Sequence, residues 1–278
     1  MRKTFLLIAI GFASLIAHAQ VLEIVSMQQI ATPGMESKVV GISPKGDYLL
    51  LTDATNTGLQ RFDLATQNIS TLTNAEGAGW DVKISQDGNK ITYRQRFNDG
   101  DQLVKHDIMQ YDLNEGQVVL QAKAQRGTEA LVDATANATV SISEDLHLVL
   151  KRNGKRIVLT PNGANEAYNW PSISPDGSKI LYYVSGRGCY VCDLNGQNMQ
   201  RIAQHCRAPQ WYDNNTVVGM ADEDDGKVLT ASAIVAYTLD GKSQILVGKQ
   251  MMAMFPFAAN GKVAFSTAAG EVFLMQVK

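Results

Sequence analysis

Residues 171–184 read PSISPDGSKILYYV, a polar turn followed by a strand-like run. The Asp176-Gly177 pair favours a tight turn, because glycine adopts left-handed backbone conformations at little cost. The run from Lys179 to Val184 is rich in β-branched and aromatic residues, which favour strands. This stretch therefore predicts two antiparallel strands joined by a short turn.

The same pattern recurs along the chain. Clear copies read VGISPKG at 40–46 and VKISQDG at 82–88, and a weaker copy reads VSISEDL at 140–146. Two degenerate copies read PQWYDNN at 209–215 and PFAANG at 256–261. Their mean spacing of about 43 residues is typical of one four-stranded propeller blade. The six copies predict an all-β fold, a six-bladed β-propeller.

Later strands of each blade can also be placed. A third strand ends in Asp-Leu, as at Asp63-Leu64 and Asp193-Leu194, and a polar turn then leads to a fourth strand. The third copy departs from this pattern, because residues 146–151 and 155–160 form one hairpin and no further strand follows. That blade has three strands, or it borrows pairing from residues 123–138.

The last copy supplies strands at 263–266 and 271–277 but no fourth strand. Residues 21–25, VLEIV, are strand-like and otherwise unassigned. We therefore expect the N-terminal segment to complete the last blade and close the ring. Such closure removes open sheet edges, which otherwise invite aggregation.

The N-terminus has the layout of a secretory signal peptide. Arg2 and Lys3 precede an apolar run over residues 5–16, and Ala17-His18-Ala19 supplies small residues before a cleavage site. The apolar run is shorter than the roughly 20 residues that span a bilayer as a helix. The sequence thus predicts a signal peptide at 1–19 and one propeller domain at 20–278. The mature protein would be periplasmic or secreted, with no membrane span.

The repeat resembles that of a known family. The Ile-Ser-Pro-Asp-Gly turn at 173–177, the Asp-Leu-Asn-Gly at 193–196 and the preceding Trp170-Pro171 are similar to the WD40-like repeat of TolB-type propellers. Propellers of prolyl oligopeptidase-like enzymes carry the same repeat. The resemblance covers nearly all of residues 21–278 and implies a six-bladed propeller with binding surfaces at the mouth of its channel. The α/β domain that precedes the TolB propeller has no counterpart here, so its docking role is not implied.

Composition and motifs exclude several function classes. A net charge of −2 does not suit a generally basic nucleic-acid binder. The chain lacks the Gly-x-Ser-x-Gly elbow of a serine hydrolase. The glycine-rich turn at 185–188 lacks the lysine and the helix start that phosphate binding requires.

Metal-binding motifs are also incomplete. His106, His147 and His205 fall in different copies and lack the spacing of a metal site. The acidic run at 222–226 is similar to a calcium loop, but Ser232 stands where the bidentate glutamate belongs. We interpret that run as a solvated hairpin loop of the fifth blade. The sequence identifies no cofactor, and any metal stays unknown.

Three tryptophans are the candidate site residues. Trp80, Trp170 and Trp211 each lie near the first strand of a copy, on the way to the channel. Aromatic rings there either stack on a ligand or fill the wedge between adjacent blades. The methionines at 251, 252 and 254 also have two interpretations, an adaptable binding surface at the mouth or packing in the core.

The three cysteines leave the disulfide state open. Cys189 and Cys192 have the spacing of a redox or zinc motif, but residues three apart on a strand face opposite sides. A hairpin through Asn195-Gly196 would set Cys189 opposite residue 203, with Cys206 three residues further on. A Cys189–Cys206 disulfide forms only if the segment after residue 203 folds back.

Two functions remain. The favoured one is an exported, non-catalytic, monomeric binding module for a protein, peptide or glycan partner in the cell envelope. The alternative is a metal-dependent small-molecule hydrolase or lyase with its site at the channel mouth. Convergent carboxylate, amide or imidazole groups at the mouth would favour the enzyme.

Overall fold

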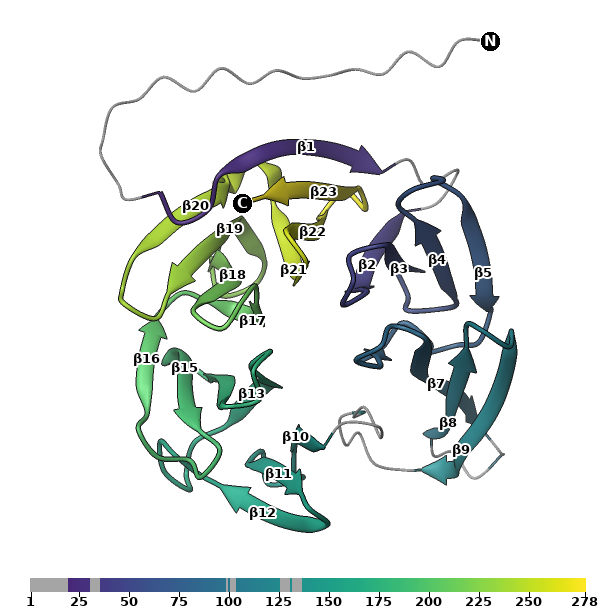
Figure 1. Cartoon of the computed structure of the whole chain (residues 1–278), viewed down its shortest axis with the longest axis horizontal. Helices are drawn as coiled ribbons and strands as arrows, with labels where there is room; N and C mark the ends of the chain where they lie inside the picture. The colour runs from purple at the N-terminus through teal and green to yellow at the C-terminus, as the bar shows by residue number, and fades with distance from the viewer. Residues whose placement is uncertain (1–19, 31–35, 99, 101–103, 126–130, 132–136) are drawn as a thin grey trace.

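A computed structural model describes residues 20–30, 36–98, 100, 104–125, 131 and 137–278 of the chain. Within these residues, six antiparallel sheets stand around a common axis like the blades of a propeller (Figure 1). The prediction of an all-β, six-bladed propeller is confirmed. Five of these sheets run outward in chain order from an innermost strand, and the sixth runs through the last three strands of the chain to the N-terminal strand.

The first three blades differ in strand number. Blade one has four strands and blade two has four, whereas blade three has three. Their strands are β2 (Ser37–Ile42), β3 (Tyr48–Asp53), β4 (Leu59–Asp63) and β5 (Ile69–Thr73); β6 (Lys83–Ile84), β7 (Lys90–Asn98), β8 (Val104–Asp112) and β9 (Gln117–Gln125); and β10 (Ala138–Ile142), β11 (Leu148–Arg152) and β12 (Lys155–Leu159).

The remaining blades each have four strands. They are β13 (Tyr168–Ile173), β14 (Lys179–Val184), β15 (Gly188–Asp193) and β16 (Gln200–Ala203); β17 (Arg207–Trp211), β18 (Thr216–Asp224), β19 (Leu229–Thr238) and β20 (Ser243–Val247); and β21 (Ala253–Ala259), β22 (Lys262–Thr267), β23 (Val272–Val277) and β1 (Ile24–Ile30). A short 3₁₀ helix, η1 (Lys249–Met251), precedes β21.

A serine–aspartate pair closes the turn after the innermost strand. In blade four, Ser174 Oγ donates to Asp176 Oδ1 at 2.6 Å and accepts from the Lys179 backbone N–H at 2.9 Å. Ser85 and Asp87 of blade two make the same 2.6 Å bond. The turn ends in a glycine with positive φ, 73° at Gly177. The motif found in the sequence therefore folds identically in these blades.

The core lies between neighbouring blades. Alternate residues of β14 point to opposite faces of its sheet, as in any strand. Ile180 and Tyr182 pack toward blade three with Leu148. Leu181 packs toward blade five with Trp211. The sheet of blade four is thus buried on both faces, which explains the near-continuous apolar run of β14.

Blade three follows the sequence expectation of a single hairpin, β11–β12, preceded by β10. Residues 126–130 and 132–136, most of the segment that was a candidate for extra pairing, lie outside the described residues. β9 ends at Gln125 and pairs with β8 of its own blade.

The first strand pairs with the last. β1 runs antiparallel to β23, with Met27 opposite Met275. It begins at Ile24, three residues later than the segment expected from the sequence. Val21 and Leu22 instead donate their backbone N–H groups to Gln244 Oε1 of blade five, at 2.7 and 2.9 Å.

The signal peptide expected at residues 1–19 lies outside the described residues. Among the described residues, no helix has the length and apolarity needed to cross a lipid bilayer.

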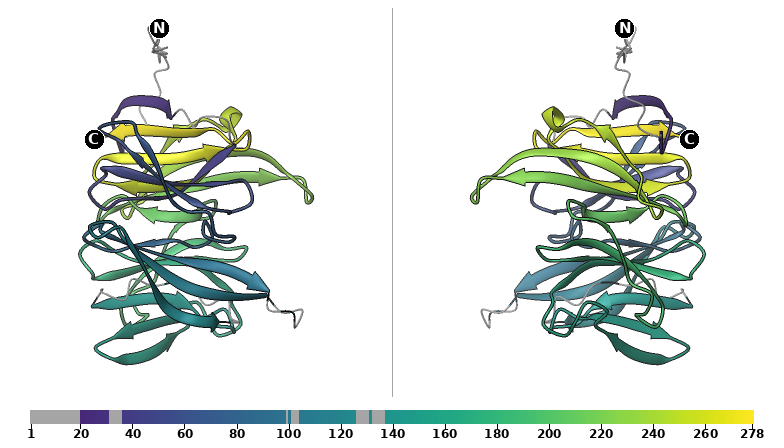
Figure 2. Two further views of the ribbon diagram at one scale, coloured as in Figure 1. Left: turned by 90° about the vertical axis from the view of Figure 1, so that its right-hand side faces the viewer. Right: turned by 90° about the vertical axis from the view of Figure 1, so that its left-hand side faces the viewer.

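Two long hairpins mark one face of the ring. β7–β8 and β18–β19 extend beyond the other strands on the same side of the molecule (Figure 2). We call this side the mouth face. The β14–β15 hairpin at 184–188 lies on it as well, because it also joins the second and third strands of its blade. The linker at 204–206 lies beside that hairpin, since Ala203 at the end of β16 pairs with Cys189.

Candidate binding cleft

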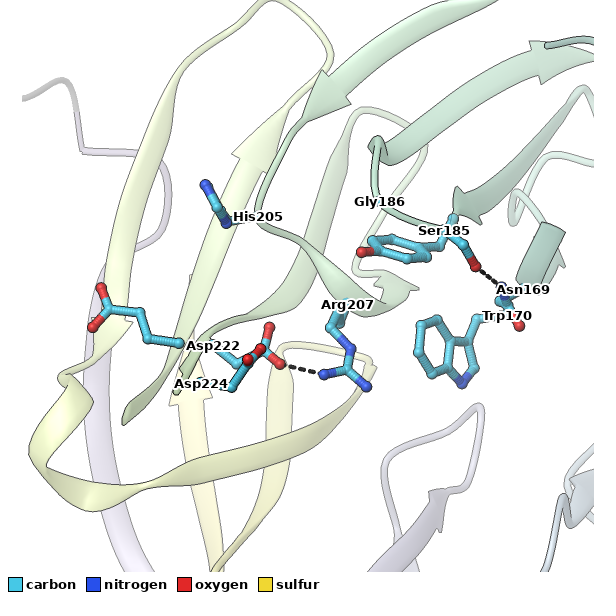
Figure 3. A pocket seen from close by; sticks show the side chains of 10 residues that line it. Asn169, Trp170, Ser185, Gly186, His205, Arg207, Asp222 and Asp224 are labelled. Atoms are coloured by element: carbon cyan, nitrogen blue, oxygen red, sulfur yellow. Dashed lines mark hydrogen bonds and ion pairs between the residues drawn. The ribbon is translucent and has the colours of Figure 1, made fainter. Parts of the chain in front are cut away.

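A cleft of about 650 Å³ lies on the mouth face between blades four and five. Its walls come from the start of β13, the β14–β15 hairpin, the linker into β17 and the end of β18 (Figure 3). The lining is rich in polar and aromatic side chains: Asn169, Trp170, Tyr183, Ser185, Gly186, His205, Arg207, Asp222, Glu223 and Asp224.

A β-bulge presents Trp170 to this cleft. The pairing of β13 with β14 shifts between Asn169 and Ser172, so Trp170 and Pro171 oppose a single residue. Trp170 adopts a left-handed conformation with φ of 47°, which is uncommon for a bulky residue. Its side chain stays 37% exposed.

The bulge is part of the repeat. β17 and β21 carry the same two-against-one shift before their own copies of the motif. The residues at the matching position, Ala208 and Phe255, have φ of 45° and 50°. The repeat thus supplies a fixed display position, and the residue placed there differs from blade to blade.

Two neighbours hold the Trp170 ring. Tyr183 meets it edge-on, with ring centroids 5.4 Å apart and planes at 62°. The Arg207 guanidinium carbon lies 5.8 Å from the Trp170 ring centroid on the side of blade five. Burial raises the pKa of Tyr183, so its side chain stays a neutral phenol.

Polar pairs within each blade lie around this ring. Arg207 Nη1 donates to Asp222 Oδ2 at 2.5 Å. On the blade-four wall, Asn169 Nδ2 donates to Ser185 Oγ at 3.0 Å (Figure 3). At the rim, Glu223 forms an ion pair with Lys249. The cleft therefore combines a fixed aromatic ring with oriented donors and acceptors.

The three tryptophans have different places. Trp170 lines the cleft. Trp211 is 8% exposed, belongs to the core between blades four and five, and donates its indole N–H to the Ser172 carbonyl at 3.4 Å. Trp80 is 59% exposed and precedes β6 of blade two, away from the cleft. The structure does not bring these residues together.

Other candidates from the sequence reach the cleft in part. The acidic run lies at the end of β18, and Asp222, Glu223 and Asp224 line the cleft from there. His205 joins them from the linker, whereas His106 lies in β8 and His147 precedes β11. No group of three or more His, Cys, Asp or Glu side chains among the described residues is suited to hold a metal ion.

Asn169, Tyr183 and Arg207 are the cleft residues that the sequence patterns did not single out. Arg207 lies two residues before the degenerate fifth copy, at the place Asn169 occupies before the fourth. Aligning the copies by the residues that precede them would have brought Asn169, Trp170 and Arg207 together as mouth-facing positions.

Comparisons with known proteins show that this chain resembles solved structures in fold alone. No protein-family model and no curated protein matches this chain. A solved structure of TolB from Acinetobacter baumannii is 18% identical with a TM-score of 0.57, and the alignment covers 75% of this chain but only 54% of that one. A putative TolB from Agrobacterium tumefaciens is 19% identical with a TM-score of 0.58, covering 89% and 91% of the two chains.

An enzyme shares the architecture. An oligogalacturonate lyase, solved in complex with manganese, is 15% identical with a TM-score of 0.53, covering 85% of this chain and 76% of the lyase. At these identities the likeness concerns the arrangement of the blades. Taken with the six sheets and the repeated turn, it shows that the chain has the fold of a TolB-like, WD40-type β-propeller.

Proposed function

We propose that this protein is an exported, non-catalytic binding module, in which residues 1–19 are a removable signal peptide and residues 20–278 a single propeller domain. It works as a monomer in the periplasm or outside the cell, and its mouth face binds a protein, peptide or glycan of the envelope. The observation that carries this proposal is the cleft between blades four and five, where Trp170 is exposed beside oriented polar groups.

The cleft suits binding better than turnover. A small-molecule site needs a concave surface and a few convergent polar groups, and the lining of the cleft supplies both. Carboxylate, amide and imidazole groups do gather in the cleft, as an enzyme would require, but the described residues include no group of three or more His, Cys, Asp or Glu side chains suited to hold a metal ion. The likeness to a manganese-bound lyase makes metal-dependent cleavage the alternative that an experiment has to address.

Site-specific cross-linking tests the binding function. A photoreactive residue at Ser185 in the cleft should capture an envelope component, and excess unlabelled wild-type protein should compete with the capture. The matched control places the same residue at exposed Gln197, in the β15–β16 turn at the opposite end of β15, where no competed product is expected. Equal capture at both positions would contradict a mouth-face site.

Manganese-dependent cleavage of oligogalacturonate by the purified protein would overturn the proposal in favour of the lyase alternative. The assay follows unsaturated product with and without added manganese, and with manganese removed by a chelator. We expect no product in any of these conditions.

A further inference from the structure

We infer that the cleft between blades four and five binds a sugar ring that is uncharged or carries an amino group, stacked on Trp170. This inference rests on the proposed binding function and names the chemical class of its ligand.

Trp170 has the properties of a stacking platform. Its ring is held by Tyr183 and Arg207 rather than free to rotate, and part of it faces solvent. The face of an indole carries negative charge and attracts the slightly positive C–H groups of a sugar ring. Because the ring is already in place, a ligand loses little binding energy in ordering it.

The surrounding side chains match the needs of hydroxyl groups. Arg207 uses one N–H group on Asp222 and keeps others for a ligand. The carboxylates of Asp222 and Asp224 offer acceptors, and the Asn169 amide offers its carbonyl oxygen as well. Neighbouring hydroxyls on a sugar ring both donate and accept, so planar groups of this kind can pair with two at once.

The charge of the lining sets the class of sugar. Asp222, Glu223 and Asp224 outnumber Arg207, and Lys249 at the rim offsets only one of them. The remaining negative charge repels a uronate carboxylate and favours a neutral ring or an ammonium group. The cleft is therefore unsuited to oligogalacturonate, the acidic oligosaccharide after which the lyase with this fold is named.

The size of the cleft agrees with this class. Small-molecule sites usually enclose roughly 300 to 1,000 Å³, and this cleft has about 650 Å³. Such a volume holds a short oligosaccharide, which can be the end of a longer glycan because the cleft opens to solvent on the mouth face.

Titration calorimetry with defined trisaccharides tests the inference. The probes are chitotriose, its de-acetylated amino form, cellotriose, mannotriose and, as the anionic comparison, trigalacturonate. We expect at least one neutral or amino-bearing probe to bind at least tenfold more tightly than trigalacturonate. Tightest binding of trigalacturonate would overturn the charge argument.

Variants assign the binding to the cleft. Trp170→Ala should weaken the best probe at least tenfold, whereas Trp170→Phe, which keeps an aromatic face, should stay within a few-fold of the wild type. Trp80→Ala is the matched control, since it removes an equally large exposed ring outside the cleft. Melting curves verify that each variant is folded. If Trp170→Ala binds the best probe as tightly as the wild type does, the assignment of the sugar site to this cleft is wrong.

An oligolysine peptide separates this inference from the proposed function. If the peptide binds and no sugar does, the sugar class is wrong, while competed cross-linking at Ser185 would still support a binding cleft. If no probe binds and the cross-link is also absent, both the inference and the proposed function fail.

Discussion

At the scale of single residues, Ser174 and Asp176 form the turn after the innermost strand of blade four. The Ser174 hydroxyl and the Ser178 backbone and side chain donate to the Asp176 carboxylate, and these bonds lower its pKa to about 2. The Ser85 hydroxyl lowers the pKa of Asp87 in the same way. Hydrogen bonds to the charged form favour ionisation, so both turns need the carboxylate.

Replacing Asp176 with asparagine should destabilise the protein at neutral pH and much less in acid. A folded pKa below the unfolded value contributes stability above the unfolded pKa, and this is lost as pH falls from about 4 toward about 2. The urea midpoints of the wild type and of Asp176→Asn should therefore differ at pH 7 and come close together at pH 3. Asp145→Asn, at the matching place of the third copy, is the control. A pH-independent difference would contradict the argument.

Gly219 leaves room for a buried sulfur. A Cβ atom at this position would lie 2.4 Å from Cys206 Sγ, well inside contact distance. Gly219→Ala should therefore cost about 1–3 kcal/mol of unfolding free energy. The effect should shrink in a Cys206→Ala background, which removes the sulfur. Denaturant unfolding of the four proteins in this cycle measures the coupling, and additive effects would show that the clash is relieved elsewhere.

The conformation of Trp170 marks the limit of prediction from single residues. A residue before proline is expected to be extended, because the proline ring disfavours other conformations. In this chain Trp170, Ala208 and Phe255 all precede proline and are all left-handed. The cause is the bulge, which depends on pairing with the next strand and is not visible in local sequence.

At the scale of elements, β15 places its two cysteines in different cores. Cys189 packs with Cys206 between blades four and five, whereas Cys192 packs between blades three and four. The register expected from the Asn195-Gly196 turn is confirmed, because Cys189 lies opposite Ala203. All three thiols are free and buried in the structure, and burial raises the pKa of Cys192 to about 12.

This arrangement predicts which disulfide bond will form when the protein is oxidised. Cys206 has its thiol hydrogen-bonded to Cys189, so a bond between these two needs the least movement. We expect peptide mapping after treatment with glutathione disulfide to show Cys189 linked to Cys206, with Cys192 still alkylated as a thiol. A Cys189–Cys192 link would contradict the opposite orientation of these residues.

Strands with local partners were predicted closely, and the strand with a remote partner was not. The run at Lys179 to Val184 matches β14 because its turn and its partner are both adjacent in sequence. β1 begins later than expected, since its register depends on β23 at the other end of the chain. The cleft could not be predicted for the same reason, because its residues come from two blades and lie close together only in the folded ring.

At the scale of the whole molecule, β1 completes the sixth blade. It covers the edge of β23 along most of its length, and Leu22 extends the contact into the core beside blade five. An uncovered β23 would present free backbone groups to other chains.

Removing residues 21–30 should therefore lower the melting temperature strongly and promote aggregation. Adding a synthetic peptide of residues 21–30 should restore stability, because it can occupy the same edge. Calorimetry and light scattering measure both effects. An unchanged melting temperature in the shortened protein would show that the pairing contributes little.

The pairing of Ile24 with Val277 also sets an order of events in folding. Contacts between residues about 250 positions apart form slowly, because a long loop has to close before they gain any energy. The other five blades contain only neighbouring strands and can form as the chain emerges. The sixth has to wait for the last strand, so β1 stays unpaired until the C-terminal end of the chain is available. Folding in this protein thus ends with the strand that is made first, the N-terminal β1.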